Sequence, residues 1–404
     1  MQFRIDSLTS LRRLIDLPPA QDITARQWAV LEPALAVTAA RLSTRLRVVA
    51  GRFLPTLHDP SAARHLNAAL GRLEFELAQA FVFFDTYMDV LTQRRPAELG
   101  AVLSGCDVLA REAMVRDHPA LRLIEPPCVY CNRGFGASIV RESVPLPDGS
   151  PNPMPLIQIP YARLKQKHNL TSILHEAGHQ DLDKLGLVAE VPETLRRALR
   201  RAGAPEPVRD LFALWAFEIG PDFWAFCLVG VAEAAALLDL FALDPADALR
   251  IAVPGPHPPP YLRTLLAIEW CRIAWGRGPW DRWAAEWRSL YPLTRAPPAT
   301  RRLLLEARRY LPEVARTLFG ARLTGLGGRA LPDLFDLAAV APDRLARITA
   351  RADTGRLDLR GLSACAQLAV FAALRQRGRL SEPALDRLMT AWLIRLGARR
   401  HDAT

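Results

Sequence analysis

Residues 156–180 read LIQIPYARLKQKHNLTSILHEAGHQ and join the two kinds of secondary structure that the chain is expected to use. The apolar run LIQIP at 156–160 predicts a short strand. The segment TSILHEAGHQ at 171–180 has apolar residues at helical spacing and predicts a helix. Upstream, 121–161 is rich in β-branched residues, glycine and proline, with further strand candidates at 128–131 and 136–141. We therefore expect an α+β fold, predominantly α, in which a small antiparallel or mixed sheet precedes a helix.

Most of the remaining sequence has the pattern of helices. Apolar residues recur every three or four positions from Leu66 to Leu91, the stripe of a long amphipathic helix. Helical patterns resume near 169 and continue, with breaks, to the end of the chain. We expect three parts, with a boundary at the glycines of 325–328: a helical domain at 1–120, the sheet-bearing domain at 121–325 and a helical region at 326–404.

Composition and charge exclude several classes of protein. The 404 residues include 52 basic and 42 acidic side chains, and the basic excess is almost all arginine. Because these arginines are spread along predicted helices, we interpret them as solvated faces and expect no nucleic-acid partner. The apolar stretch 223–243 carries Glu233 and Asp239, so we expect a buried helix and no membrane span. Residues 1–8 lack the apolar run of a signal peptide, which predicts a cytoplasmic protein, with export by a leaderless route as the alternative.

The helix predicted at 171–180 carries the pattern H-E-x-x-H as His175, Glu176 and His179. Residues four apart lie on one face of a helix, so both imidazoles can bind the same metal ion. Two histidines at this spacing are typical zinc ligands. Glu176 comes one residue after the first ligand, beside the metal, where a carboxylate can act as general base toward the attacking water. We therefore expect Zn²⁺ as the cofactor.

A catalytic zinc ion needs a third protein ligand. Glu218 begins an E-x-x-x-D pattern in a helical segment, and Asp222 can accept the second ring N–H of a ligating histidine and fix its tautomer. Asp222 itself, Glu190 and Glu193 are alternative ligands. Pro221 between the two acids predicts a kink in this helix.

The order H-E-x-x-H followed by E-x-x-x-D resembles that of the gluzincin metallopeptidases. The segment HPPPYLR at 257–263 is similar to the H-P-x-x-x-x-R segment of their CAAX-prenyl-protease-like branch, although the long membrane spans of that branch are missing. The resemblance covers 175–263. It implies a zincin-like core, Glu218 as third ligand, His257 as donor to the oxyanion and Arg263 as a residue that holds substrate and site geometry. Tyr261 is the alternative oxyanion donor.

The resemblance also implies an antiparallel edge strand that holds the peptide backbone by strand addition. Residues 132–137 and 156–160 are the two candidates. The expected function is that of a zinc-dependent metallopeptidase acting on a peptide or protein, in which Glu176 takes a proton from water and passes it to the leaving amine. The alternatives are a non-proteolytic, iron-dependent enzyme that modifies peptides, and a scaffold with a non-catalytic metal site. The sequence predicts no oligomeric state.

Overall fold

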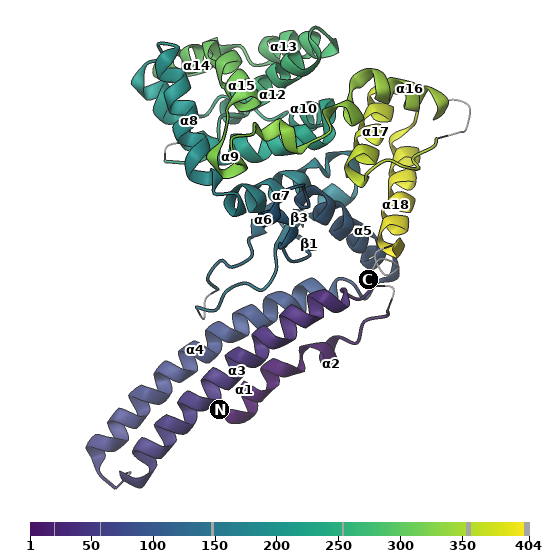
Figure 1. The fold of residues 1–404 in the computed structure, drawn as a ribbon. Coiled ribbons are helices and arrows are strands. Elements are labelled where there is room, and N and C mark those ends of the chain that lie inside the picture. Colours follow the sequence, from purple (N-terminus) through teal and green to yellow (C-terminus); the bar gives the residue numbers. More distant parts are fainter. Residues whose placement is uncertain (20, 57, 147–148, 253, 353–356, 400–404) are drawn as a thin grey trace.

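The computed structural model describes residues 1–404 except 20, 57, 147–148, 253, 353–356 and 400–404. It is mostly helical and contains one small mixed sheet, which confirms the predicted α+β class, predominantly α. Figure 1 shows a long pair of helices that extends away from a larger body.

The extended part is built from the first four helices, α1 (Gln2–Ser7), α2 (Leu11–Ile15), α3 (Ala25–Phe53) and α4 (Pro60–Thr92). The apolar stripe predicted between Leu66 and Leu91 faces α3 and the short helices, and it buries Leu73, Leu77 and Leu91. Thr24 and Gln27 form a capping box at the start of α3. The stripe therefore explains why α3 and α4 pair along their length (Figure 1).

The sheet lies between this helical pair and the body. Its strands are β1 (Cys128–Asn132), β2 (Ser138–Val140) and β3 (Leu156–Pro160), in the order β1-β3-β2. β1 pairs with β3 in parallel, and β2 pairs with β3 in antiparallel orientation. β3 is thus the central strand and 133–137 is an irregular connection, so both edge-strand candidates were wrong. The edge next to helix α7 (Thr171–Lys184) is β2.

The body is centred on two long helices that cross each other, α7 and α9 (Glu206–Val229). A Cβ atom on Gly178 of α7 would lie 2.9 Å from the Cα of Pro221 and 3.0 Å from the Cβ of Trp224, both on α9. Glycine at 178 is therefore what lets the two backbones approach this closely. The predicted kink does not end the helix, since α9 continues through Pro221 to Val229.

The other helices surround this pair. They are α5 (Ala97–Met114), α6 (Pro119–Arg122), α8 (Leu187–Arg201), α10 (Val231–Leu240), α11 (Pro245–Ala248), α12 (Pro260–Trp275), α13 (Pro279–Leu290), α14 (Pro298–Arg309), α15 (Leu311–Gly320), α16 (Pro342–Ala352), α17 (Ala364–Gln376) and α18 (Glu382–Arg399). One hydrophobic cluster runs from α5 to α18, and a second one joins α1–α4 to β1 and β3. The three predicted domains stay predictions. The two clusters divide the helices between α4 and α5. Helix α18 packs directly against α5.

The apolar stretch 223–243 is two helices and not one. α9 ends at Val229, and Gly230 has a positive φ of 60° before α10 begins at Val231. Of the described helices, only α9 is long and apolar enough to cross a membrane, and 89% of its most apolar window is buried inside the fold. This is weak evidence for a span, because the core helix of a soluble protein has the same properties.

Candidate metal centre

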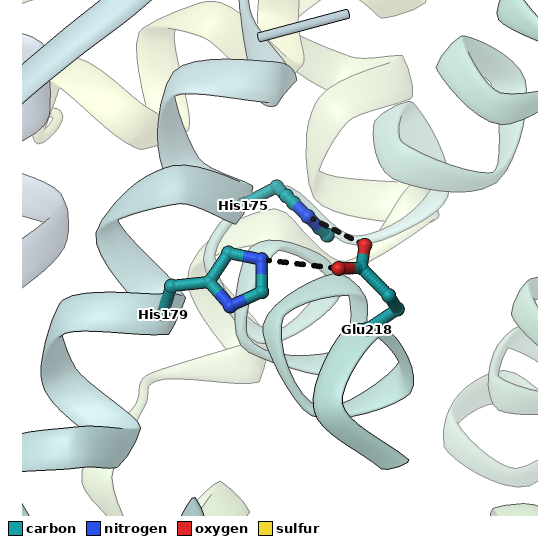
Figure 2. Close-up of side chains that lie close together, drawn as sticks. All are labelled: His175, His179 and Glu218. Carbon is teal, nitrogen blue, oxygen red and sulfur yellow. Dashed lines mark ion pairs between the residues drawn. The ribbon is translucent and has the colours of Figure 1, made fainter. Parts of the chain in front are cut away.

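Three predicted ligands meet where α7 and α9 cross. His175 and His179 lie on successive turns of α7 and direct their rings toward the carboxylate of Glu218 on α9 (Figure 2). The Nε2 atoms of His175 and His179 lie 3.4 Å and 3.6 Å from the two oxygens of Glu218. We call these three residues the metal group, because their ligand atoms all lie within 4.8 Å of one another.

The metal group fits a divalent metal ion. Tetrahedral zinc with bonds of about 2.0–2.1 Å places its ligand atoms about 3.4 Å apart, close to the distances across the two helices. All three side chains are buried, and two imidazoles with one carboxylate form the donor set of many catalytic zinc sites. Other divalent metals accept the same donors, so the geometry alone does not select zinc.

Behind the metal group, Asp222 and Arg263 hold His175. The Nδ1 atom of His175 lies 2.7 Å from Asp222 Oδ1, which directs Nε2 to the side of Glu218. Arg263 on α12 donates from Nη2 to the same oxygen at 2.7 Å and from Nε to the other oxygen. The predicted partner of the histidine is therefore in place, and Arg263 positions Asp222 by a bidentate pair.

The environment sets the charge of each ligand. The pKa of Glu218 is lowered, because the hydrogen bond and charge of His175 outweigh the effect of burial. Burial, and then the charge of His175, lower the pKa of His179 to about 3. Burial also opposes the charged form of His175, but the charge and hydrogen bond of Asp222 outweigh it and raise the pKa to about 10. Glu218 is thus ionised and His179 neutral at pH 7, the forms that bind a metal ion, whereas His175 must release a proton when its Nε2 binds the metal.

Glu176 follows His175 in the sequence, and both side chains line a cavity in front of the metal group. Glu176 is 5% exposed. Burial raises its pKa, the charge of His175 opposes this and the charge of Glu218 adds to it, which leaves the pKa at about 7. A carboxyl group balanced near neutral pH can both accept and return a proton.

The structure separates His257 from its alternative. The exposed His257 side chain lines the cavity, with Nε2 at 3.5 Å from Glu218 Oε1, but it lies outside the metal group. Tyr261 is buried away from the cavity, and its hydroxyl accepts a hydrogen bond from Arg308 at 2.9 Å. Of the two candidate oxyanion donors, the fold therefore brings only His257 to the site.

The two alternative metal ligands on α8 lie elsewhere. Glu190 accepts hydrogen bonds from the backbone N–H groups of Thr324 and Gly325. Glu193 lies on the surface, 3.6 Å from Arg196. Neither belongs to the metal group.

The site opens into a cavity of about 690 Å³ with mostly apolar walls. β2 forms one wall with Ser138 and Ile139, and α10 forms another with Leu237 and Leu240. These walls would surround a ligand next to the metal group, as expected for a binding site.

Four buried polar residues that line this cavity were not predicted as site residues: Arg163, Asn169, Thr171 and Glu233. Burial raises the pKa of Glu233 to about 7, and the charge of Asp222 adds to this. Glu233 Oε2 and Asn169 Oδ1 have no hydrogen-bond partner. The sequence carried a signal that Glu233 is a site residue, because it is a carboxylate inside an apolar helical run. No spacing pattern indicates Arg163 or Asn169.

Comparison of the chain with protein-family models, with curated proteins and with solved structures gives no match. The resemblance to gluzincins and the zincin-like core therefore stay predictions from 175–263. Only the residues of the site itself indicate a function.

Proposed function

We propose that this chain is a zinc-dependent metallopeptidase that hydrolyses peptide bonds with Glu176 as general base. One observation carries the proposal: the three-residue metal group and Glu176 line the same cavity, with His175 held by Asp222. A structural metal site needs neither a buried acid beside the ligands nor a cavity in front of them.

His175, His179 and Glu218 are the residues that would hold the metal. A zinc ion bound there would polarise the scissile carbonyl and make water more acidic. Glu176 takes a proton from the attacking water as the oxygen bonds to the carbonyl carbon. It then gives this proton to the amide nitrogen as the C–N bond breaks, so that the carboxylate is restored. Glu176 is the only residue in this scheme that moves a proton.

His257 is the residue best placed to stabilise the charge that develops on the carbonyl oxygen. It lies at the rim of the cavity beside Glu218, from where its ring can donate a hydrogen bond. β2 supplies the substrate-binding edge in this proposal. It pairs with β3 on one side, Ser138 and Ile139 line the cavity, and an extended peptide can add to a strand with an open side.

The test combines metal analysis with a peptide library. Purified protein is expected to carry about one zinc ion per chain and to cleave library peptides, with the activity lost on chelation and restored by zinc. Replacement of His175 or His179 by Ala is expected to remove most of the metal.

Glu176→Gln separates catalysis from metal binding. This variant is expected to keep the zinc and to lose about 10²–10⁴-fold or more in rate, because no base takes the water proton. Glu190→Gln is the matched control, since Glu190 caps a backbone turn and should leave both readouts unchanged. Iron with 2-oxoglutarate-dependent turnover would support the alternative enzyme class, and bound metal without any turnover would support a scaffold.

A further inference from the structure

Arg163 is a buried arginine in the wall of the candidate active-site cavity. It lies in a short 3₁₀ turn, Tyr161–Leu164, directly after β3, and is 5% exposed. Burying a guanidinium group is costly unless carboxylates or several hydrogen bonds compensate for the lost water.

Few interactions compensate for the burial of the Arg163 guanidinium group. Its Nη1 lies 3.4 Å from the side-chain oxygen of Gln166 and its Nη2 3.5 Å from the backbone oxygen of Phe135, both at the limit of a hydrogen bond. Its Nε has no partner. Burial lowers the pKa of Arg163, and no carboxylate of the described residues acts against this.

The other buried arginines of the described residues are paired. Arg94 forms an ion pair with Asp107 at 3.0 Å, and Arg263 forms its bidentate pair with Asp222. Arg141 also lines the cavity, but it lies 2.8 Å from Asp183. Arg163 thus differs from the paired arginines, because it lines the cavity without a carboxylate partner among the described residues.

We propose that Arg163 binds a carboxylate group of the peptide substrate. This inference rests on the proposed function, because it names the substrate class of the same cavity. A carboxylate matches the planar donors of a guanidinium group and replaces the charge partner that the chain itself does not provide. The carboxylate comes either from the C-terminus of the peptide or from an aspartate or glutamate side chain. The first source makes the protein a carboxypeptidase, and the second makes it a peptidase selective for acidic residues.

Two pairs of peptides distinguish these sources. In the first pair the peptides differ only in a free C-terminal carboxylate or a C-terminal amide. In the second pair both peptides are amidated and differ in one internal Glu or Gln. We expect wild-type protein to favour the charged member of one pair by about 10- to 100-fold in kcat/KM, the range of a charge-assisted hydrogen bond.

Arg163→Gln is expected to abolish this preference, because it lowers kcat/KM for the charged peptide far more than for its neutral partner. Arg163→Lys keeps the charge and should retain part of the preference. Arg141→Gln is the matched control in the same cavity, and it should retain the whole preference because Arg141 already has a carboxylate partner. Equal rates within both pairs for wild-type protein, or a preference that persists in Arg163→Gln, would overturn the proposal.

A binding assay keeps this test separate from the proposed function. Dye-labelled pentapeptides of alanine and leucine, with free or amidated C-termini or with one Glu or Gln, are titrated into the Glu176→Gln protein, and anisotropy reports binding. If wild-type protein cleaves no peptide, the peptidase proposal fails. The carboxylate site still stands if the Glu176→Gln protein binds the charged peptides more tightly and this preference disappears in the double variant with Arg163→Gln. Removal of an unpaired buried charge should leave the melting temperature unchanged or raise it. A lower melting temperature together with equal losses on all peptides would assign Arg163 a structural role and overturn the inference.

Discussion

Gly178→Ala tests whether the close crossing of α7 and α9 builds the metal centre. The added methyl group would lie 2.9 Å from the Cα of Pro221 and 3.0 Å from the Cβ of Trp224. Normal contacts between carbon atoms are about 3.5–4.0 Å, so the two helices must separate by about 0.5–1 Å. Backbone atoms form part of this contact, and no flexible side chain can move to relieve it.

The expected cost follows from two opposing effects. Overpacking of a core costs about 1–3 kcal/mol, whereas replacing glycine by alanine inside a helix stabilises it by about 1 kcal/mol. The net destabilisation is therefore expected to be up to about 2 kcal/mol. Because a metal site tolerates displacements of only about 0.5 Å, zinc affinity should fall together with stability.

Thermal unfolding by circular dichroism and competition with a chromophoric zinc chelator measure the two effects. The control is Gly71→Ala, on the exposed side of α4, where an added Cβ has no neighbour within 4 Å. This control should gain up to about 1 kcal/mol and leave zinc binding unchanged. If Gly178→Ala behaves like Gly71→Ala in both assays, the crossing of the two helices does not set the geometry of the site.

Three other substitutions separate the roles of the surrounding residues. Asp222→Asn removes the charged partner of His175 and Arg263, and is expected to lower zinc affinity by about 10- to 100-fold in a chelator competition. His257→Ala should keep zinc and lower kcat by about 10²–10³-fold in steady-state kinetics with little change in KM, whereas loss of zinc would make His257 a ligand. Burial raises the pKa of Glu233 to about 7 in the fold, above its unfolded value of about 4.5. The protonated carboxyl group therefore stabilises the folded state most below pH 4.5, and this contribution is lost as the pH rises to 7. Metal-free wild-type protein should therefore lose stability relative to Glu233→Gln over this window in denaturant titrations, and parallel curves would contradict the burial of an acid at this position.

The sequence predicted the parts of the site that depend on local spacing. Positions four apart on a helix share a face. This was enough to predict that His175 and His179 lie together, and that Glu218 and Asp222 lie on one face of their helix. The same periodicity also explains why Tyr261 is absent from the cavity. Tyr261 and Arg263 are two residues apart in the first turn of α12, so a helix that directs Arg263 to Asp222 turns Tyr261 away.

Features that depend on distant parts of the chain were not predictable in this way. Strand positions were correct, but the sheet order β1-β3-β2 is set by pairing across a long connection, and neither edge candidate was right. Arg163 follows a strand without any motif, and only the fold shows that its guanidinium group is buried beside a cavity. Gly230 did carry a local signal, since a glycine within an apolar helical run can mark a break between two helices.

The charges of the cavity connect the two proposals. Glu218 belongs to the metal group, Glu176 and Asp222 lie beside it, and Arg263 is already paired with Asp222. Once His175 has released its proton, this region therefore has more negative than positive charge. A divalent cation would correct the imbalance without another basic residue. Arg163 has the opposite imbalance, because its positive charge is buried and burial alone shifts its pKa. With a divalent cation in the metal group, a peptide could present its carbonyl group to the cation and a carboxylate to Arg163. We therefore expect a substrate with its negative charge on one side of the scissile bond.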